Sequence, residues 1–326
     1  MTPDLPRVPL AVLPTPLEPL PRLSEALRGP RLFVKRDDLT GLAGGGNKTR
    51  KLEYVLAQAA AQDADTLVTV GALQSNHCRQ TAAAAARHGL RCVVVLRGHP
   101  PEDVTGNLLL DHLLGARVVF SGDRPREQVM DEVVAEERAA GRRPYPIPLG
   151  ASTPLGALGY VRAMLEVVEQ AKAMRVSFER IIVASSSGGT QAGLILGARL
   201  AGFAGEVLGI SVDLEKEALR ARVADIATGA ARLLGESHRF EAEAVSVNDD
   251  YLGGGYAVMG EPEREAIRTF ARREGLLLDP VYTGRAAAGM LDLIRRGAIR
   301  PDETILFWHT GGIPALWAYR AGLAGG

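Results

Sequence analysis

The feature of this sequence that most constrains its fold is the alternation of short β-branched runs with longer Ala- and Leu-rich stretches. The short runs are apolar without a polar residue at every second position, which is typical of strands buried on both faces of a parallel sheet. The pattern predicts an α/β fold with right-handed crossovers. The expected strands are Thr66–Gly71, Arg91–Arg97, Ala116–Ser121, Arg180–Ala184, Val207–Val212 and Glu303–His309. The expected helices are Lys51–Ala61, Gln80–Arg87, Pro125–Gly141, Leu158–Val176, Gln191–Ala201, Pro262–Glu274 and Gly284–Arg296.

The chain of 326 residues is long enough for roughly two domains. Two loops rich in glycine or proline, residues 40–46 and 142–159, interrupt the pattern. We predict a small domain of residues 51–158 inserted into a large domain built from residues 1–50 and 159–326. The residues alone equally permit two consecutive domains.

The composition excludes several classes of function. Lys plus Arg and Asp plus Glu both total 38, so no nucleic acid or anionic membrane is expected as partner, although a small acidic substrate is compatible. No run approaches the ~20 apolar residues of a membrane span, and the proline-rich N-terminus does not resemble a signal peptide. The two cysteines, Cys78 and Cys92, suggest neither a disulfide framework nor a metal site. We therefore expect a soluble cytoplasmic protein that binds no metal.

Lys48 occupies an unusual position for a lysine. It follows three glycines and Asn47, a good N-cap residue, so it falls in the first turn of a helix. The helix dipole disfavours a positive charge there, whereas a lysine that loses its proton to become a nucleophile is well placed. Phosphate binding and a plain solvated lysine are the alternatives, and the spacing is not that of a P-loop.

The segment Ser185–Thr190 (SSSGGT) lies between a predicted strand and a predicted helix. Backbone N–H groups of a glycine turn at a helix N-terminus bind anions, and hydroxyls add donors, so a phosphate is favoured. Asp213 follows where a ribose-binding acid would sit in a dinucleotide site, but the G-x-G-x-x-G fingerprint is absent. A simple tight turn is the remaining alternative.

Polar side chains also gather at other strand ends, where open parallel sheets bind ligands. Gln74–His77 follow the first expected strand, and Thr310–Gly312 follow the last. Tyr282 and Thr283 precede a helix, and Tyr256 follows three glycines. Each group alone is compatible with packing, but together they predict one crevice lined from both domains.

Five strings carry a specific resemblance: VKRDDLTGLAGGGNKTRKLEY, GALQSNHCRQTAAAAA, SSSGGTQAGL, LLLDPVYTG and HTGG. They resemble the pyridoxal-phosphate enzymes of the D-cysteine desulfhydrase and 1-aminocyclopropane-1-carboxylate deaminase family, from about Pro14 to the C-terminus. The resemblance implies the fold type of the tryptophan synthase β-subunit, with two open, twisted, mostly parallel sheets flanked by helices and the small domain inserted in the large one. It implies pyridoxal 5′-phosphate as cofactor and an amino acid as substrate; a homodimer is the default expectation.

The resemblance also implies roles for individual residues. Lys48 corresponds to the lysine that forms the Schiff base, and Lys35 keeps a structural interpretation. The residues implied to hold the cofactor are Lys48, Lys51, Asn76, Gly188, Gly189, Thr190 and Thr310. Those implied to meet the substrate are Ser75, Asn76, His77, Tyr256, Tyr282 and Thr283. The implied catalytic residues are Lys48, Ser75 and Tyr282, and either Lys48 or Ser75 moves the α-proton.

Two positions bear on the substrate. Deaminases of the family carry Glu after the tyrosine of DPVY and Leu after the histidine of the last motif, where this chain has Thr283 and Thr310. A carboxylate facing the pyridine nitrogen strengthens the electron sink, which ring opening needs more than thiolate loss does. The sequence therefore predicts elimination from D-cysteine to pyruvate, hydrogen sulfide and ammonia. The alternatives are ring-opening deamination, sulfite elimination from cysteate, a nicotinamide oxidoreductase, and a cofactor carrier or amino-acid sensor without turnover.

Overall fold

The computed structural model describes residues 5–324, which form an α/β fold with two sheets. The larger sheet has the strand order β1-β2-β10-β7-β8-β9. Its β1 pairs antiparallel with β2, and the remaining pairs are parallel. The strands are β1 (Leu17–Pro19), β2 (Arg31–Arg36), β7 (Arg180–Ser185), β8 (Glu206–Ser211), β9 (Val247–Asn248) and β10 (Thr304–His309).

The smaller sheet is built entirely from the middle of the chain. Its order is β5-β4-β3-β6, with every pair parallel. The strands are β3 (Thr66–Gly71), β4 (Arg91–Leu96), β5 (Arg117–Phe120) and β6 (Pro144–Ile147). The predicted α/β class with two mostly parallel sheets is thus confirmed, while the domain boundaries at residues 51 and 158 stay a prediction.

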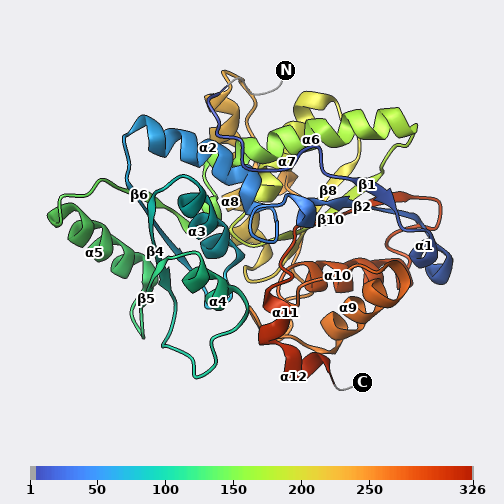
Figure 1. The fold of residues 1–326 in the computed structure, drawn as a ribbon. Helices are drawn as coiled ribbons and strands as arrows, with labels where there is room; N and C mark the ends of the chain where they lie inside the picture. Colours follow the sequence, from blue (N-terminus) through green and yellow to red (C-terminus); the bar gives the residue numbers. More distant parts are fainter. Residues whose placement is uncertain (1–4, 325–326) are drawn as a thin grey trace.

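Helices cover both faces of the larger sheet (Figure 1). One face packs against α6 (Pro154–Met174) and α7 (Gly189–Ala201), with α8 (Lys216–Leu233) outside them. The other face packs against α1 (Pro21–Leu27), α9 (Glu261–Glu274) and α10 (Thr283–Arg295). Apolar side chains on both faces of β7, such as Ile181 and Ile182, are fully buried, which explains its unbroken apolar run.

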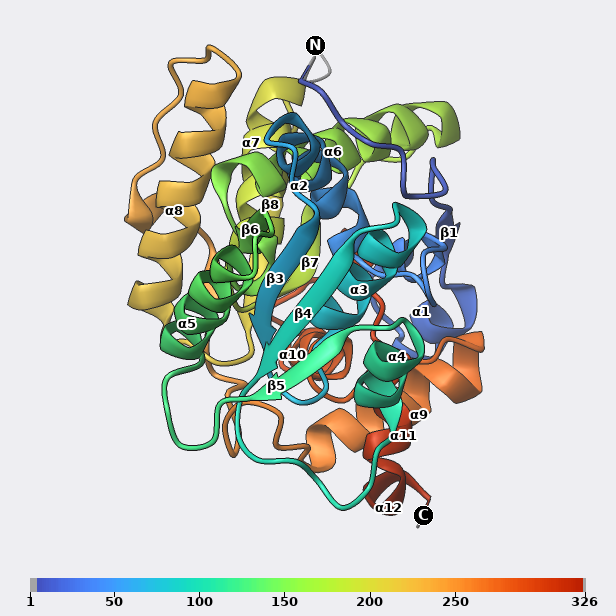
Figure 2. The ribbon, with the colours of Figure 1, turned by 60° about the vertical axis from the view of Figure 1, so that its left-hand side comes forward.

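The smaller sheet is covered in the same way (Figure 2). On one face lie α2 (Lys48–Ala61), α3 (Asn76–Arg87) and α4 (Gly106–Leu113), whose apolar residues pack with Leu67 and Val94. On the other face α5 (Arg126–Ala139) buries Val129, Val133 and Val134. Each fully buried valine or leucine contributes roughly 1.5–3 kcal/mol to folding. Each sheet therefore has a substantial hydrophobic core of its own.

Every strand predicted from the sequence is present with its ends within one residue. The predicted helices begin up to four residues earlier than expected, except α5 (Arg126–Ala139), which begins one residue later. The pattern missed β1, β2, β6 and β9 and the helices α1, α4, α8, α11 (Ala315–Ala318) and α12 (Arg320–Leu323). Three short 3₁₀ helices, Asp37–Leu39, Leu149–Ala151 and Ala242–Ala244, complete the described elements. No helix within residues 5–324 is long and apolar enough to cross a membrane.

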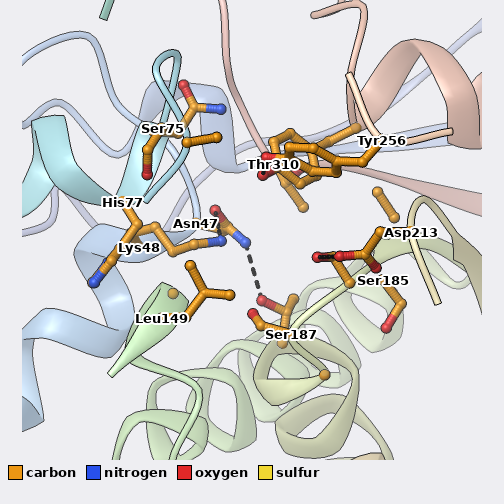
Figure 3. Close-up of a pocket in the computed structure, with 18 of the residues that line it drawn as sticks. Asn47, Lys48, Ser75, His77, Leu149, Ser185, Ser187, Asp213, Tyr256 and Thr310 are labelled. Atoms are coloured by element: carbon orange, nitrogen blue, oxygen red, sulfur yellow. Dashed lines mark hydrogen bonds between the residues drawn. The ribbon is translucent and has the colours of Figure 1, made fainter. Parts of the chain in front are cut away.

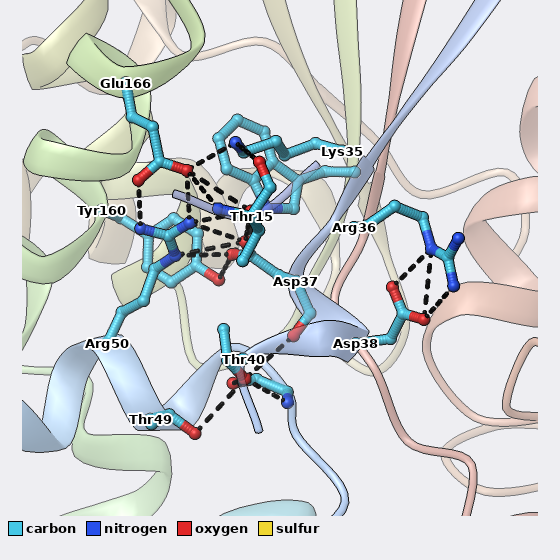
Figure 4. Close-up of polar contacts among 12 residues, drawn as sticks. Thr15, Lys35, Arg36, Asp37, Asp38, Thr40, Thr49, Arg50, Tyr160 and Glu166 are labelled. Carbon is cyan, nitrogen blue, oxygen red and sulfur yellow. Dashed lines mark hydrogen bonds and ion pairs between the residues drawn. The ribbon is translucent and has the colours of Figure 1, made fainter. Parts of the chain in front are cut away.

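A buried polar cluster fastens the start of α2 to the larger sheet (Figure 4). The Arg50 guanidinium donates to Asp37 Oδ1 at 2.9 Å and to Glu166 Oε2 at 3.0 Å. Asp37 also accepts hydrogen bonds from Tyr160 and Trp308. Lys35, fully buried, donates to the Thr15 carbonyl oxygen at 2.7 Å and to Glu166. The structural interpretation of Lys35 is confirmed.

Candidate active site

A cavity of about 290 Å³ lies where the carboxyl ends of the two parallel sheets face each other. Segments that follow β3, β4 and β6 line it from the smaller sheet, and segments that follow β7, β8 and β10 line it from the larger one. Figure 3 shows Lys48, Ser75 and His77 on one side of this cavity, with Tyr256, Asp213 and Ser187 across it. The predicted single crevice is therefore present, as expected for ligand sites of open α/β sheets.

Glycines allow the chain to reach Lys48 in this geometry. Gly45 has φ +68°, and a Cβ there would lie 2.0 Å from the Asp38 carbonyl oxygen. Gly46 has φ +126° and packs against the loop after β10. Asn47 is the N-cap residue of α2, as predicted, but its side chain makes no capping hydrogen bond. Its amide instead donates to Thr190 Oγ1 at 3.0 Å and accepts from Lys48 Nζ at 3.1 Å, so Asn47 ties α2 to the loop after β7.

The environment of Lys48 favours a neutral amine. Burial lowers the pKa of Lys48 to about 8, although the negative charge of Asp279 opposes the shift. The Lys48 ammonium has no carboxylate within ion-pair distance among the described residues. An amine with this pKa is a substantially better nucleophile at neutral pH than a surface lysine.

The loop after β7 forms a cradle for an anion. Gly188 has φ +83° and precedes α7, whose first turn leaves backbone N–H groups without helical partners. A Cβ at Gly189 would lie 2.8 Å from the Ser152 Cα and 2.9 Å from Lys51 Nζ, so only glycine fits there. Ser152 Oγ lies 2.6 Å from Ser187 Oγ and 3.0 Å from Lys51 Nζ. Serine hydroxyls and a lysine thus converge on this loop.

Lys51 belongs to this cradle although it does not line the cavity itself. It is buried, and its Nζ donates to the Gly150 carbonyl oxygen and to Ser152. Burial, together with the neighbouring positive charge of Lys48, lowers the pKa of Lys51 well below its usual value. Two buried lysines without a carboxylate partner in the described part of the chain fit a doubly charged anion such as a phosphate ester.

The segment Ser75–His77 presents polar groups from the smaller sheet. Ser75 caps α3, since its Oγ accepts from the Cys78 N–H at 3.1 Å, and its own hydroxyl hydrogen remains available to the cavity. Thr69 Oγ1 donates to the Ile147 carbonyl oxygen, so it accepts from His77 Nε2 at 2.8 Å. Burial and the two nearby lysines lower the pKa of His77 far below its usual value. His77 is therefore a neutral imidazole with its proton on Nε2.

Two tyrosines and a threonine close the side formed by the larger sheet. The hydroxyls of Tyr256 and Tyr282 lie 2.5 Å apart, and their rings meet edge to face with centroids 6.1 Å apart. Burial raises the pKa of both, so both are neutral phenols near pH 7. Thr310 lines the cavity, and its carbonyl oxygen accepts from the Asn47 N–H.

Thr283 lies outside the cavity, which corrects its predicted place among the residues that meet the substrate. It is fully buried at the start of α10, where its Oγ1 donates to Asp279 Oδ1 at 2.7 Å and accepts from the Asp279 N–H at 2.8 Å. The Asp279 carboxylate also accepts from the N–H groups of Val281 and Tyr282. Position 283 thus shapes the cavity through the turn that carries Tyr282.

The sequence analysis missed several residues of the site. Ser152 was hidden in a loop treated as a domain break, although a serine beside glycines is typical of anion-binding turns. Arg97 and Arg126 line the cavity from the ends of β4 and α5, and surface arginines give no signal in sequence alone. Asp213, considered from the sequence only as an acid of a dinucleotide site, lines the cavity and accepts from the Ser186 hydroxyl at 2.8 Å.

The fold and the site together define an α/β enzyme in which a buried lysine with a lowered pKa lies near a loop suited to bind a phosphate. A sequence profile described as pyridoxal-phosphate dependent enzyme matches residues 8–311. A 1-aminocyclopropane-1-carboxylate deaminase of Burkholderia ambifaria (strain MC40-6) is 42% identical over 325 residues, 96% of this chain and 96% of the relative. A D-cysteine desulfhydrase of Yersinia enterocolitica serotype O:8 is 45% identical over 322 residues, 97% of this chain and 96% of the relative.

Among solved structures, an ACC deaminase homologue superposes with a TM-score of 0.90 at 40% identity, covering 98% of this chain and 96% of that one. The chain therefore belongs to the family of pyridoxal-phosphate dependent enzymes. Within it, the chain belongs with the D-cysteine desulfhydrases and 1-aminocyclopropane-1-carboxylate deaminases. Its cofactor is pyridoxal 5′-phosphate, and the buried lysines and glycine cradle fit this cofactor.

Proposed function

We propose that this chain eliminates hydrogen sulfide from D-cysteine, giving pyruvate and ammonia after addition of one water. The observation that carries the proposal is the Thr310 side chain on the cavity wall, at the position where the deaminases of the family carry a leucine. Thr283, at the position where they carry a glutamate, lies outside the cavity and binds Asp279, so position 283 supplies no carboxylate here. Loss of a thiolate, a good leaving group, makes a smaller demand on the electron sink than opening of a cyclopropane ring.

In this proposal different residues hold the aldehyde and the phosphate of the cofactor and the carboxylate of the substrate. Lys48 binds the cofactor aldehyde, and Lys51 with the Gly188–Thr190 loop holds the phosphate. When bound, the cofactor withdraws electrons from the substrate α-carbon. Ser75 and the N–H groups that begin α3 receive the substrate carboxylate, since a helix N-terminus favours an anion.

Lys48 is also the group that we propose moves the α-proton. Its lowered pKa lets it accept and return a proton near pH 8. The Ser75 oxygen already accepts the Cys78 N–H, which makes it the poorer base. The Tyr256–Tyr282 pair offers a hydroxyl to the departing sulfur. We also propose that the protein is a cytoplasmic homodimer. A dimer is the commonest soluble assembly, and sedimentation tests it. Both cysteines are free thiols, which fits the cytoplasm.

The direct test supplies the cofactor-loaded protein with D-cysteine, L-cysteine, cysteate and 1-aminocyclopropane-1-carboxylate in separate assays. We expect pyruvate and sulfide in equal amounts from D-cysteine, with at least tenfold lower turnover of the others. Release of 2-oxobutanoate from the cyclopropane amino acid, without sulfide from D-cysteine, would refute the proposal. Substitution of Lys48 by Ala serves as the inactive control.

A second candidate, elimination of sulfite from cysteate, is favoured by one observation. Arg97 and Arg126 both line the cavity from the smaller sheet, where guanidinium groups are suited to an anionic β-substituent. The discriminating variant is Arg97→Gln. Under this second function it weakens cysteate turnover and leaves D-cysteine unaffected; equal effects on both substrates would contradict a role for Arg97 in selecting a sulfonate.

A further inference from the structure

Asn107 lies in the smaller sheet's half of the molecule, outside every motif that drew attention in the sequence. It is the second residue of α4 and is fully buried. Its backbone N–H donates to Gln74 Oε1 at 2.7 Å, and its side-chain Nδ2 donates to the Gln74 carbonyl oxygen at 3.0 Å. The same Nδ2 donates to Asn76 Oδ1 at 2.9 Å. Asn107 thus holds the segment that carries Ser75, Asn76 and His77 toward the cavity.

The hydrogen-bond pattern fixes which way both amides face. A backbone carbonyl oxygen can only accept, so the Asn107 atom in contact with the Gln74 carbonyl must be its nitrogen. That nitrogen also contacts Asn76, so the Asn76 atom that faces Asn107 must be its oxygen. The remaining Asn76 atom, Nδ2, finds no acceptor among the described residues and belongs to a side chain that lines the cavity.

We propose that Asn107 is a positioning residue that makes Asn76 a hydrogen-bond donor toward the cofactor. Asn76 and Lys48 line the same cavity, and the ring oxygen of pyridoxal 5′-phosphate is next to the aldehyde that Lys48 would bind, so Asn76 would donate to the cofactor there. This oxygen is the ring hydroxyl of the cofactor, and it is ionised when it accepts the hydrogen bond from Asn76. A charge-assisted hydrogen bond from Nδ2 stabilises that ionised oxygen. This inference rests on the proposed attachment of the cofactor to Lys48 and is independent of the identity of the substrate.

Gly106 makes the close approach possible. It has φ +60°, and a Cβ at this position would lie 2.3 Å from Gln74 Oε1 and 2.8 Å from the Pro314 carbonyl oxygen. Gln74 in turn donates through Nε2 to the Thr105 carbonyl oxygen at 3.1 Å. The start of α4 and the loop after β3 are thereby locked together, and Asn76 cannot exchange its amide atoms without breaking a bond to Asn107.

The test is the isosteric substitution Asn107→Asp in the cofactor-loaded protein without substrate. The introduced carboxylate accepts from the Asn76 amide, which turns the Asn76 oxygen toward the cofactor and removes the donor. The pH midpoint of the visible absorption change, which reports the proton shared by the ring oxygen and the Lys48 nitrogen, should move upward by about one unit. Asn248→Asp, the same exchange at a position whose amide pairs with Asp250 in solvent, should leave the midpoint unchanged.

A purely structural role for Asn107 would change stability without moving this midpoint in the uncharged variant Asn107→Ala, and that outcome in the folded, cofactor-loaded protein would overturn the proposal. Should Asn107→Asp not fold, Asn107→Ala removes the constraint without adding charge, and a smaller upward shift is expected. The double variant Asn76→Ala with Asn107→Ala should titrate like Asn76→Ala alone; additive shifts would also overturn it. Since no substrate is present, failure of D-cysteine turnover would leave these results unaffected.

Discussion

Lys48 combines burial with a single amide partner, Asn47, and this determines its chemistry at the scale of one residue. A lysine with its usual pKa is almost entirely protonated at neutral pH and cannot attack an aldehyde. With a pKa of about 8, roughly a tenth of the amine is neutral at pH 7 and about nine tenths at pH 9. In its proposed role as nucleophile, Lys48 is thus partly neutral before the cofactor binds.

This pKa predicts how cofactor loading depends on pH. Because only the neutral amine reacts, the rate of covalent capture by cofactor-free protein should rise about tenfold between pH 7 and pH 9 and level off above. Stopped-flow absorbance after addition of pyridoxal 5′-phosphate measures it. A rate that keeps rising steeply to pH 10.5 would show that Lys48 has an unshifted pKa. Lys172→Ala, at an exposed position on α6, provides the control with an unchanged profile.

At the scale of secondary-structure elements, the cluster around Arg50 and Asp37 joins four of them: α2, α6, β10 and the short helix after β2. Burial raises the pKa of Asp37, but the positive charges of Arg50 and Lys35 outweigh it, so Asp37 stays ionised. The position of α2 relative to the larger sheet therefore depends on this carboxylate.

Removal of Arg50 should be costly. Arg50→Met leaves Asp37 and Glu166 buried without their main partner, and the free energy of unfolding should fall by about 3–5 kcal/mol. Urea denaturation of the cofactor-free protein measures it. Arg295→Met is the matched control, since its ion pair with Glu265 leaves both side chains about half exposed, and it should cost less than about 1 kcal/mol. Equal costs for both variants would mean that the cluster adds nothing specific.

Some secondary-structure elements could be predicted from the sequence, and others could not. Strands such as β3 and β7 were predicted because burial on both faces leaves an unbroken apolar run. By contrast, β6 carries prolines at 144 and 146 and lies at the sheet edge, where a missing N–H is tolerated, so its sequence looks like a loop. The strand β9 has two residues and is too short for any pattern. The amphipathic helix α8 was not predicted, although Leu219, Val223 and Ile226 recur on one of its faces.

Some features of the candidate site could likewise be predicted from the sequence, and others could not. Glycine loops and the lysine position pointed to Lys48 and the Gly188 region because those features deviate from ordinary helix and turn composition. The direction of individual side chains could not be predicted, as Thr283 and Asn47 show, because their hydrogen bonds depend on local turn geometry or on a partner distant in sequence. The tie between Asn107 and Asn76 spans 31 residues and leaves no trace in composition.

For the molecule as a whole, the cavity lies between two sheets that each have a core of their own, so a ligand held by both should couple them. Lys48 and Lys51 lie on α2, which packs on the smaller sheet and on α6 over the larger one, and the Gly188 loop follows β7. A ligand that binds only the folded protein adds about 2.7 kcal/mol of stability at a hundredfold excess over its Kd.

Cofactor removal should therefore lower the thermal unfolding midpoint of the entire protein in a single transition. With Lys48→Ala, added pyridoxal 5′-phosphate should still raise the midpoint through the phosphate cradle, but less than in the unaltered protein. Pyridoxal, which lacks the phosphate, should give no rise with Lys48→Ala. Differential scanning calorimetry measures all three; an increase with pyridoxal equal to that with the phosphate would contradict the role of the Gly188 loop.

The separation of the cradle from the β3–α3 loop has an evolutionary consequence. The residues proposed to hold the cofactor phosphate lie on α2 and after β7, whereas the segments that carry Ser75 and Tyr256 are proposed to meet the amino acid. Mutations can accumulate among the residues that meet the amino acid while those that hold the cofactor stay unchanged. An enzyme can therefore change its substrate and keep its cofactor site. Two relatives of almost equal identity to this chain bear different enzyme names, in keeping with such a history. A laboratory library confined to positions 283 and 310 would test it.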